Sequence, residues 1–112
     1  PGATTYLFLG DSFVFGQGLD DHETLAAQFT RATGGTHQGL NFGVPGYGPN
    51  HLVRAMETGL IARNAPRDVR AVVTWIIPAQ LERISGSGAW LDSSPRYVLR
   101  AGRPEFTGSF AD

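Results

Sequence analysis

Three short apolar segments, separated by stretches long enough for a helix, constrain the fold of this chain most strongly. Thr4–Leu9, Leu40–Val44 and Arg70–Ile77 are rich in β-branched, aromatic and leucine side chains, which is typical of buried strands. Between the first two, a capping-box spacing at Asp20 predicts a helix. Between the second and third, Pro49 predicts the first position of a helix that runs to about residue 63. The order is therefore strand, helix, strand, helix, strand.

This alternation predicts an α/β fold with a parallel sheet and right-handed crossovers. We expect a three-layer, flavodoxin-like sandwich with strand order 2-1-3 in this portion of the chain. The continuous apolar character of Arg70–Ile77 predicts that this strand is covered on both faces. After it, Gln80–Ile84 predicts a short helical turn and Ser85–Ser94 a loop. Arg96–Phe110 predicts a C-terminal β-hairpin.

A chain of 112 residues and 12.0 kDa predicts one domain, spanning residues 1–112. A domain of this architecture usually has about five strands or more, so we expect a truncated domain. The third strand would then have an unpaired edge, and we expect copies of the chain to associate through that edge.

Composition excludes several kinds of chemistry. The net charge is −1 and all nine cations are scattered arginines, which argues against a nucleic-acid partner. Without lysine there is no P-loop or Schiff base, and without cysteine no disulfide, thiolate nucleophile or iron–sulfur cluster. The three histidines lie too far apart for a helical zinc pair, so we expect no metal and no cofactor. No apolar segment approaches the ~20 residues of a membrane span. The sequence does not identify the cellular compartment of the protein, which could be an exported or periplasmic one.

A serine follows the first predicted strand, in the tripeptide Gly10-Asp11-Ser12. A serine at a strand-to-helix turn exposes its hydroxyl group at the edge where ligands bind such sheets. By itself, the tripeptide is better explained by Asp11 or Ser12 capping the next helix, since both are preferred N-cap residues.

A glycine-rich loop, Gly43–Asn50, follows the second predicted strand. Its glycines let backbone N–H groups approach a ligand closely. Taken alone, this loop is a turn before a helix that begins with proline. Together, the two loops favour a serine nucleophile beside an anion pocket.

These two segments resemble a known family. Leu9–Phe13 with Gly16, and Asn41–Asn50, are similar to the first and second blocks of the SGNH (GDSL-type) hydrolases, over about half of the chain. The resemblance implies that Ser12 is the nucleophile and that its own backbone N–H lies in the oxyanion hole. It also implies that Gly46 is the second backbone donor.

Two other family blocks depart from the pattern. The asparagine of the third block is absent, and Gln80 is the only carboxamide in a suitable place to donate to an oxyanion. The Asp-x-x-His pair that supplies the base is also absent. Solvated or capping roles are favoured for all three histidines, His51 included. We therefore expect a base encoded beyond Asp112 and little or no activity from this chain alone.

The resemblance implies a serine ester hydrolase that acts on a small-molecule, lipid or acylated-glycan ester. An O-acyltransferase of the same family and a non-catalytic glycan- or partner-binding module remain alternatives. Arg83 is expected to pair with a carboxylate or lie in solvent. Further candidates for substrate contacts are Asp11, Tyr47, Asn50 and Trp90.

Overall fold

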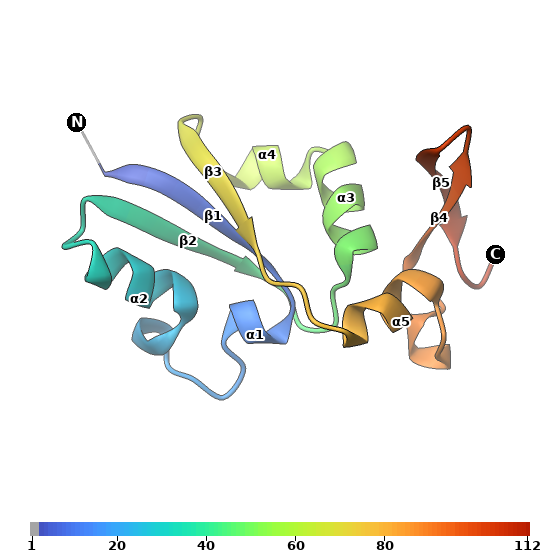
Figure 1. Cartoon of the computed structure of the whole chain (residues 1–112), viewed down its shortest axis with the longest axis horizontal. Coiled ribbons are helices and arrows are strands. Elements are labelled where there is room, and N and C mark those ends of the chain that lie inside the picture. The colour runs from blue at the N-terminus through green and yellow to red at the C-terminus, as the bar shows by residue number, and fades with distance from the viewer. Residues whose placement is uncertain (1–2) are drawn as a thin grey trace.

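The computed structural model, which describes residues 3–112, contains two separate sheets (Figure 1). The larger is parallel and consists of β1 (Thr4–Gly10), β2 (His37–Gly43) and β3 (Val69–Thr74) in the order β2-β1-β3. The predicted strand order is therefore confirmed. Gly10 pairs with Gly43, so β1 and β2 end side by side at the same edge of the sheet.

Helices lie on both faces of this sheet and make the three predicted layers (Figure 1). The predicted single helix after Pro49 is two helices, because Gly59 adopts a left-handed backbone with φ of +78°. The segment predicted as a loop after the third strand also contains one 3₁₀ turn. The helical elements are α1 (Ser12–Phe15), η1 (Asp21–Glu23), α2 (Leu25–Ala32), α3 (Pro49–Glu57), α4 (Leu60–Asn64), α5 (Ala79–Ser85) and η2 (Ala89–Leu91).

The core forms because alternate side chains of β1 point to opposite faces of the sheet. Leu7 and Leu9 pack with Leu52 of α3 on one face. Phe8 packs with Ala26 of α2 on the other face. Strand β1 is thus buried on both faces, which fixes the position of the loop that follows it.

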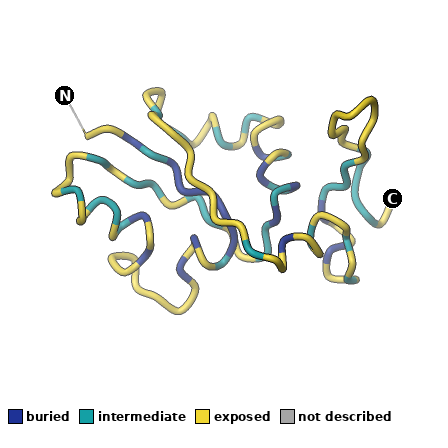
Figure 2. The backbone as a smooth tube through the Cα atoms, in the orientation of Figure 1, coloured by how far each residue is buried: buried dark blue, intermediate teal, exposed yellow. Residues whose placement is uncertain are grey.

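Strand β3 is exposed, and the prediction that it is covered on both faces is wrong (Figure 2). Val72 is 49% exposed and Trp75, just beyond the strand, 47%. The helices pack over β1 and β2, and within residues 3–112 the close contacts of β3 are with β1. The strand also ends at Thr74 and not at Ile77, because Thr74 pairs with Leu9 near the end of β1.

The smaller sheet is the predicted hairpin, formed by antiparallel strands β4 (Pro95–Arg100) and β5 (Arg103–Ser109). It packs against α3 and α5, away from β3, and leaves the β3 edge open (Figure 1). The radius of gyration of 15.4 Å accordingly exceeds the roughly 13 Å expected for a compact domain of this length.

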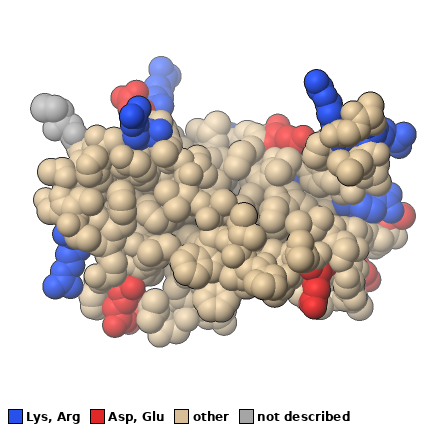
Figure 3. Space-filling model, in the orientation of Figure 1, with Lys and Arg blue, Asp and Glu red and all other residues tan. Residues whose placement is uncertain are grey.

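Charged side chains are spread thinly over the face shown in Figure 3, with a wide uncharged area between them. Across residues 3–112, the structure has no helix with the length and apolar character needed to cross a membrane.

Candidate active site

Ser12 is the first residue of α1, directly after the carboxyl end of β1. The helix begins there because Asp11 is its N-cap and accepts a 3.0 Å hydrogen bond from the Phe13 N–H. The predicted capping role of Asp11 is therefore confirmed. Ser12 is half-buried, and within residues 3–112 neither its N–H nor its hydroxyl group has a hydrogen-bond partner.

The glycine loop forms a tight turn beside the carboxyl end of β1. The Tyr47 N–H donates to the Val44 carbonyl oxygen at 3.1 Å, which closes a turn over Pro45 and Gly46. Gly46 has φ of +83°, the conformation that a type II turn requires at its third residue. The Gly46 N–H has no protein acceptor in the part of the chain that is described. The Val44 N–H donates to the Gly10 carbonyl oxygen at 3.0 Å, so the turn lies against the end of β1.

Close backbone packing holds α1 against β2. A Cβ atom on Gly43 would lie 2.2 Å from the backbone nitrogen of Phe15, so only glycine fits there. The Asn41 side chain donates to the Phe15 carbonyl oxygen at 3.0 Å and accepts from the Gly43 N–H at 2.9 Å. These contacts fix the helix that begins with Ser12 relative to the strand that leads into the glycine loop.

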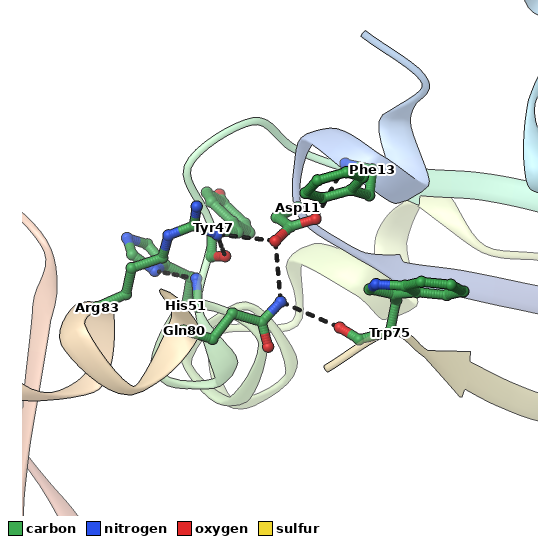
Figure 4. A network of polar contacts seen from close by, with 8 residues as sticks. Asp11, Phe13, Tyr47, His51, Trp75, Gln80 and Arg83 are labelled. Atoms are coloured by element: carbon green, nitrogen blue, oxygen red, sulfur yellow. Dashed lines mark hydrogen bonds and ion pairs between the residues drawn. The ribbon is translucent and has the colours of Figure 1, made fainter. Parts of the chain in front are cut away.

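The residue before Ser12, Asp11, carries a buried carboxylate, whose polar contacts are drawn in Figure 4. Asp11 is 0% exposed, and its Oδ2 accepts from Gln80 Nε2 at 3.0 Å and from Arg83 Nη1 at 2.8 Å. The same Arg83 nitrogen donates to the Tyr47 carbonyl oxygen at 2.8 Å. One guanidinium nitrogen therefore joins the serine turn to the glycine loop.

The pKa of Asp11 lies below its ordinary value. Burial alone raises the pKa of this carboxyl group, because a low-dielectric environment disfavours its charge. The hydrogen bonds from Gln80, the Phe13 N–H and Arg83, together with the positive charge of Arg83, outweigh that effect. Asp11 is thus held as a carboxylate.

Three sequence-predicted residues, Gln80, Asp11 and Asn50, make side-chain hydrogen bonds within the protein, although the buried Oδ1 of Asn50 has no partner in residues 3–112. Gln80 uses both hydrogens of Nε2, one for Asp11 and one for the Trp75 carbonyl oxygen at 3.0 Å, so it has none for an oxyanion. Asp11 is fully buried, and Asn50 is buried with Nδ2 bonded to the Arg83 and Pro95 carbonyl oxygens. Both side chains bind other parts of this protein, and the substrate contacts expected of Asp11 and Asn50 stay predictions.

The two aromatic candidates differ in their exposure. The Tyr47 ring is half-buried and stacks on His51, with ring centroids 4.5 Å apart. Trp90 is 63% exposed, and its ring lies against Gly46, where an added Cβ would be 3.6 Å away. An indole with this much open surface beside Gly46 is placed to touch a ligand, and its substrate contact stays a prediction.

His51 has a capping role, as predicted. Its Nδ1 accepts from the Gly48 N–H at 3.0 Å, and its Nε2 lies 3.1 Å from the Ser94 hydroxyl oxygen. Because Nδ1 accepts, the ring proton resides on Nε2 and is directed at Ser94. Burial, and to a smaller degree the charge of Arg83, lower the pKa of His51. Both nitrogens of the neutral His51 ring therefore make hydrogen bonds to residues other than Ser12.

Arg83 is the residue whose role sequence reasoning missed. Its pairing with a carboxylate was expected, but not its bond to the glycine loop. One signal was present: Gln80 and Arg83 are three residues apart on a predicted helical turn, a spacing that puts both on one face. In residues 3–112, no group of three histidine, aspartate or glutamate side chains is placed to hold a metal ion.

Neither the family models nor the curated protein sequences contain a match to this chain. Solved structures do. The chain is similar to AlinE4, an SGNH-hydrolase family esterase. The similarity covers 77% of the present chain, with a TM-score of 0.59 and 22% identity. Two mutants of the same esterase give the same TM-score at 21% and 22% identity. The chain spans 45% of the length of these structures. Over the matched residues, this chain therefore has the fold of an SGNH-hydrolase family esterase, as its two glycine-containing segments predicted.

Proposed function

We propose that this chain carries the nucleophile and the oxyanion-binding part of a serine ester hydrolase of the SGNH type. The observation that carries the proposal is the pair of unpartnered N–H groups, of Ser12 and Gly46, on two loops joined by hydrogen bonds. Backbone donors fixed in advance stabilise the negative charge that develops on an ester oxygen during acyl transfer. The similarity in fold to the esterase AlinE4 supports the same proposal.

In this mechanism the Ser12 Oγ attacks the carbonyl carbon of an ester and gives its proton to a general base. The carbonyl oxygen becomes an oxyanion that accepts hydrogen bonds from the Ser12 and Gly46 N–H groups. The intermediate collapses, the bond to the alcohol oxygen breaks, and the alcohol takes the proton from the base. Water then releases the acid from Ser12. In an acyltransferase, a second alcohol would replace water.

The general base is proposed to lie outside residues 3–112. Within these residues no histidine or carboxylate bonds to the Ser12 hydroxyl, and His51 is occupied by Gly48 and Ser94. Serine at its ordinary pKa needs such a base. We therefore propose that a longer chain supplies a histidine, and that Gln80 contributes by holding Asp11 and not by binding the oxyanion.

The surface beside Ser12 favours an acyl ester as the substrate. Ligand pockets in proteins have volumes of about 300–1,000 Å³. A cavity of about 360 Å³ is lined by Ser12, Phe13, Gly16, Gln17 and Leu19. Phe13 and Leu19 are largely exposed there. Small-molecule, lipid and acylated-glycan esters all present such an acyl group.

The test is acylation of Ser12 by p-nitrophenyl acetate, with imidazole added as the missing base. Mass spectrometry should find one acetyl group on the peptide that contains Ser12. Ser12→Ala should abolish it, whereas the control Ser93→Ala, at an exposed serine, should not. Without imidazole we expect almost no reaction. No acetylation of Ser12 with imidazole would favour the second candidate, a binding module without catalysis.

A further inference from the structure

The Arg83 side chain connects three parts of the proposed site that are far apart in the sequence. It lies on α5, and Nη1 is 2.8 Å from both Asp11 Oδ2 and the Tyr47 carbonyl oxygen. Asp11 is 72 residues and Tyr47 36 residues away along the chain. The side chain of Arg83 is only 14% exposed, so these bonds are shielded from water.

The residues around Arg83 leave room for its side chain to bond to both loops. An added Cβ on Gly48 would lie 2.8 Å from the Arg83 Cβ, so glycine at that position lets α5 approach the loop. The guanidinium carbon is 5.9 Å from the centre of the Trp90 ring, which itself rests against Gly46. The arginine side chain thus reaches both Tyr47 of the glycine loop and Asp11 of the serine turn (Figure 4).

The charge of Arg83 also matters for an oxyanion. Asp11 immediately precedes Ser12, and its buried carboxylate would repel negative charge developing at the serine. Arg83 offsets that charge without occupying the Ser12 or Gly46 N–H groups. An arginine nitrogen with two hydrogens can make both of its bonds at once.

We infer that Arg83 is a positioning residue that fixes the Gly46 turn relative to Ser12. The N–H groups of Ser12 and Gly46 can then donate to the same oxyanion. This inference rests on the proposed function. Arg83 does not touch the ester in this scheme. It acts through the Tyr47 carbonyl oxygen and through Asp11.

The test compares variants in the imidazole-assisted acetylation of Ser12, a reaction in which the Oγ–carbon bond forms, p-nitrophenolate leaves and imidazole takes the proton. Arg83→Gln should lower the maximal acylation rate about a hundredfold, the size of effect seen when one oxyanion donor is lost. The ester concentration for half-maximal rate should change little, because the ester is not bound by Arg83. Arg83→Lys should recover more of the rate than Arg83→Gln does, because the ammonium group of lysine has three donors and keeps the positive charge.

A double variant guards against loss of folding. Asp11→Asn with Arg83→Gln leaves no unpaired buried charge, so it should keep the circular dichroism spectrum of the unchanged chain. It should remain slow in acylation, because nothing holds the Tyr47 carbonyl oxygen. Amide hydrogen exchange at Tyr47 and Gly48 should be faster than in the unchanged chain, with exchange at Gly39 of β2 unaltered.

Two negative results have different meanings. If the unchanged chain shows no acetyl group on Ser12, the proposed function fails and the role of Arg83 fails with it. If Ser12 is acetylated, but the double variant reacts and exchanges like the unchanged chain, Arg83 only offsets the charge of Asp11 and the inference is overturned.

Discussion

Gly43 and Phe15 are in such close backbone contact that no side chain fits between them. A Cβ on Gly43 would lie 2.2 Å from the Phe15 nitrogen and 2.8 Å from its Cα. The end of β2 and the helix that begins with Ser12 therefore depend on each other. Any side chain at position 43 must push α1, and Ser12 with it, away from the glycine loop.

We predict that Gly43→Ala lowers the free energy of unfolding by about 1–3 kcal/mol, the usual effect of overpacking. Urea denaturation measures this change. The control is Gln38→Ala, at an exposed position of the same strand, which should have a much smaller effect. Equal stability of the two variants would contradict the close contact.

Asp11 should make stability fall in acid. Its pKa in the folded chain is below the ordinary value, so its stabilising effect is present above pH of about 4 and is lost as pH falls toward the lowered pKa. Asp11→Asn removes this effect and leaves Arg83 unpaired, which costs about 3 kcal/mol or more at pH 7. Urea denaturation at pH 7 and pH 3 should show a smaller difference for the variant than for the unchanged chain.

His51 should add a second pH dependence at higher pH. Its pKa is lowered on folding, so the unfolded chain takes up a proton first, and stability falls as pH decreases below about 6.5. His51→Asn keeps an acceptor for the Gly48 N–H but cannot titrate, so this fall should disappear. Ser94→Ala keeps the imidazole, so the fall in stability below pH of about 6.5 should remain in this variant. Thermal unfolding between pH 7.5 and 5, roughly the range in which histidine titrates, distinguishes these outcomes.

Tyr97 links the hairpin to α3 through a short hydrogen bond from its hydroxyl group to Glu57. Burial and the neighbouring Glu57 carboxylate raise the pKa of Tyr97 to about 12. Phenolate absorbance, taken as the difference from Tyr97→Phe, should therefore show a midpoint near that value. Glu57→Gln should lower the midpoint, since it removes the negative charge. An unchanged midpoint in Glu57→Gln would show that the two side chains are not paired in solution.

The exposed edge of β3 should allow copies of this chain to associate. Val73 lies on this strand with much of its side chain exposed, and an open strand edge pairs readily with another strand. We expect light scattering to show association that increases with concentration and weakens in Val73→Lys. Leu99→Lys, at an exposed position of the hairpin, should not weaken it. A chain that stays monomeric at all concentrations would contradict this prediction.

Local sequence was sufficient for the elements that carry their own signals. Asp11 caps α1, Pro49 starts α3, and the turn over Gly46 follows from proline and glycine at its two corners. Each of these depends on residues within four positions of one another. The parallel sheet and its order followed from the alternation of strands and helices, which restricts how such strands connect.

Only the tertiary structure decided how the candidate site is held together and that β3 stays exposed. The bonds of Gln80 and Arg83 to Asp11 span 69 and 72 residues, and no local periodicity encodes a partner at that separation. An apolar run such as Val72–Val73 predicts a strand, but whether other elements cover it depends on where the crossover helices pack. The sequence thus determined the local conformation of Ser12 and Gly46, whereas long-range packing determined that Arg83 joins their loops, because side-chain partners are selected by proximity in the folded chain.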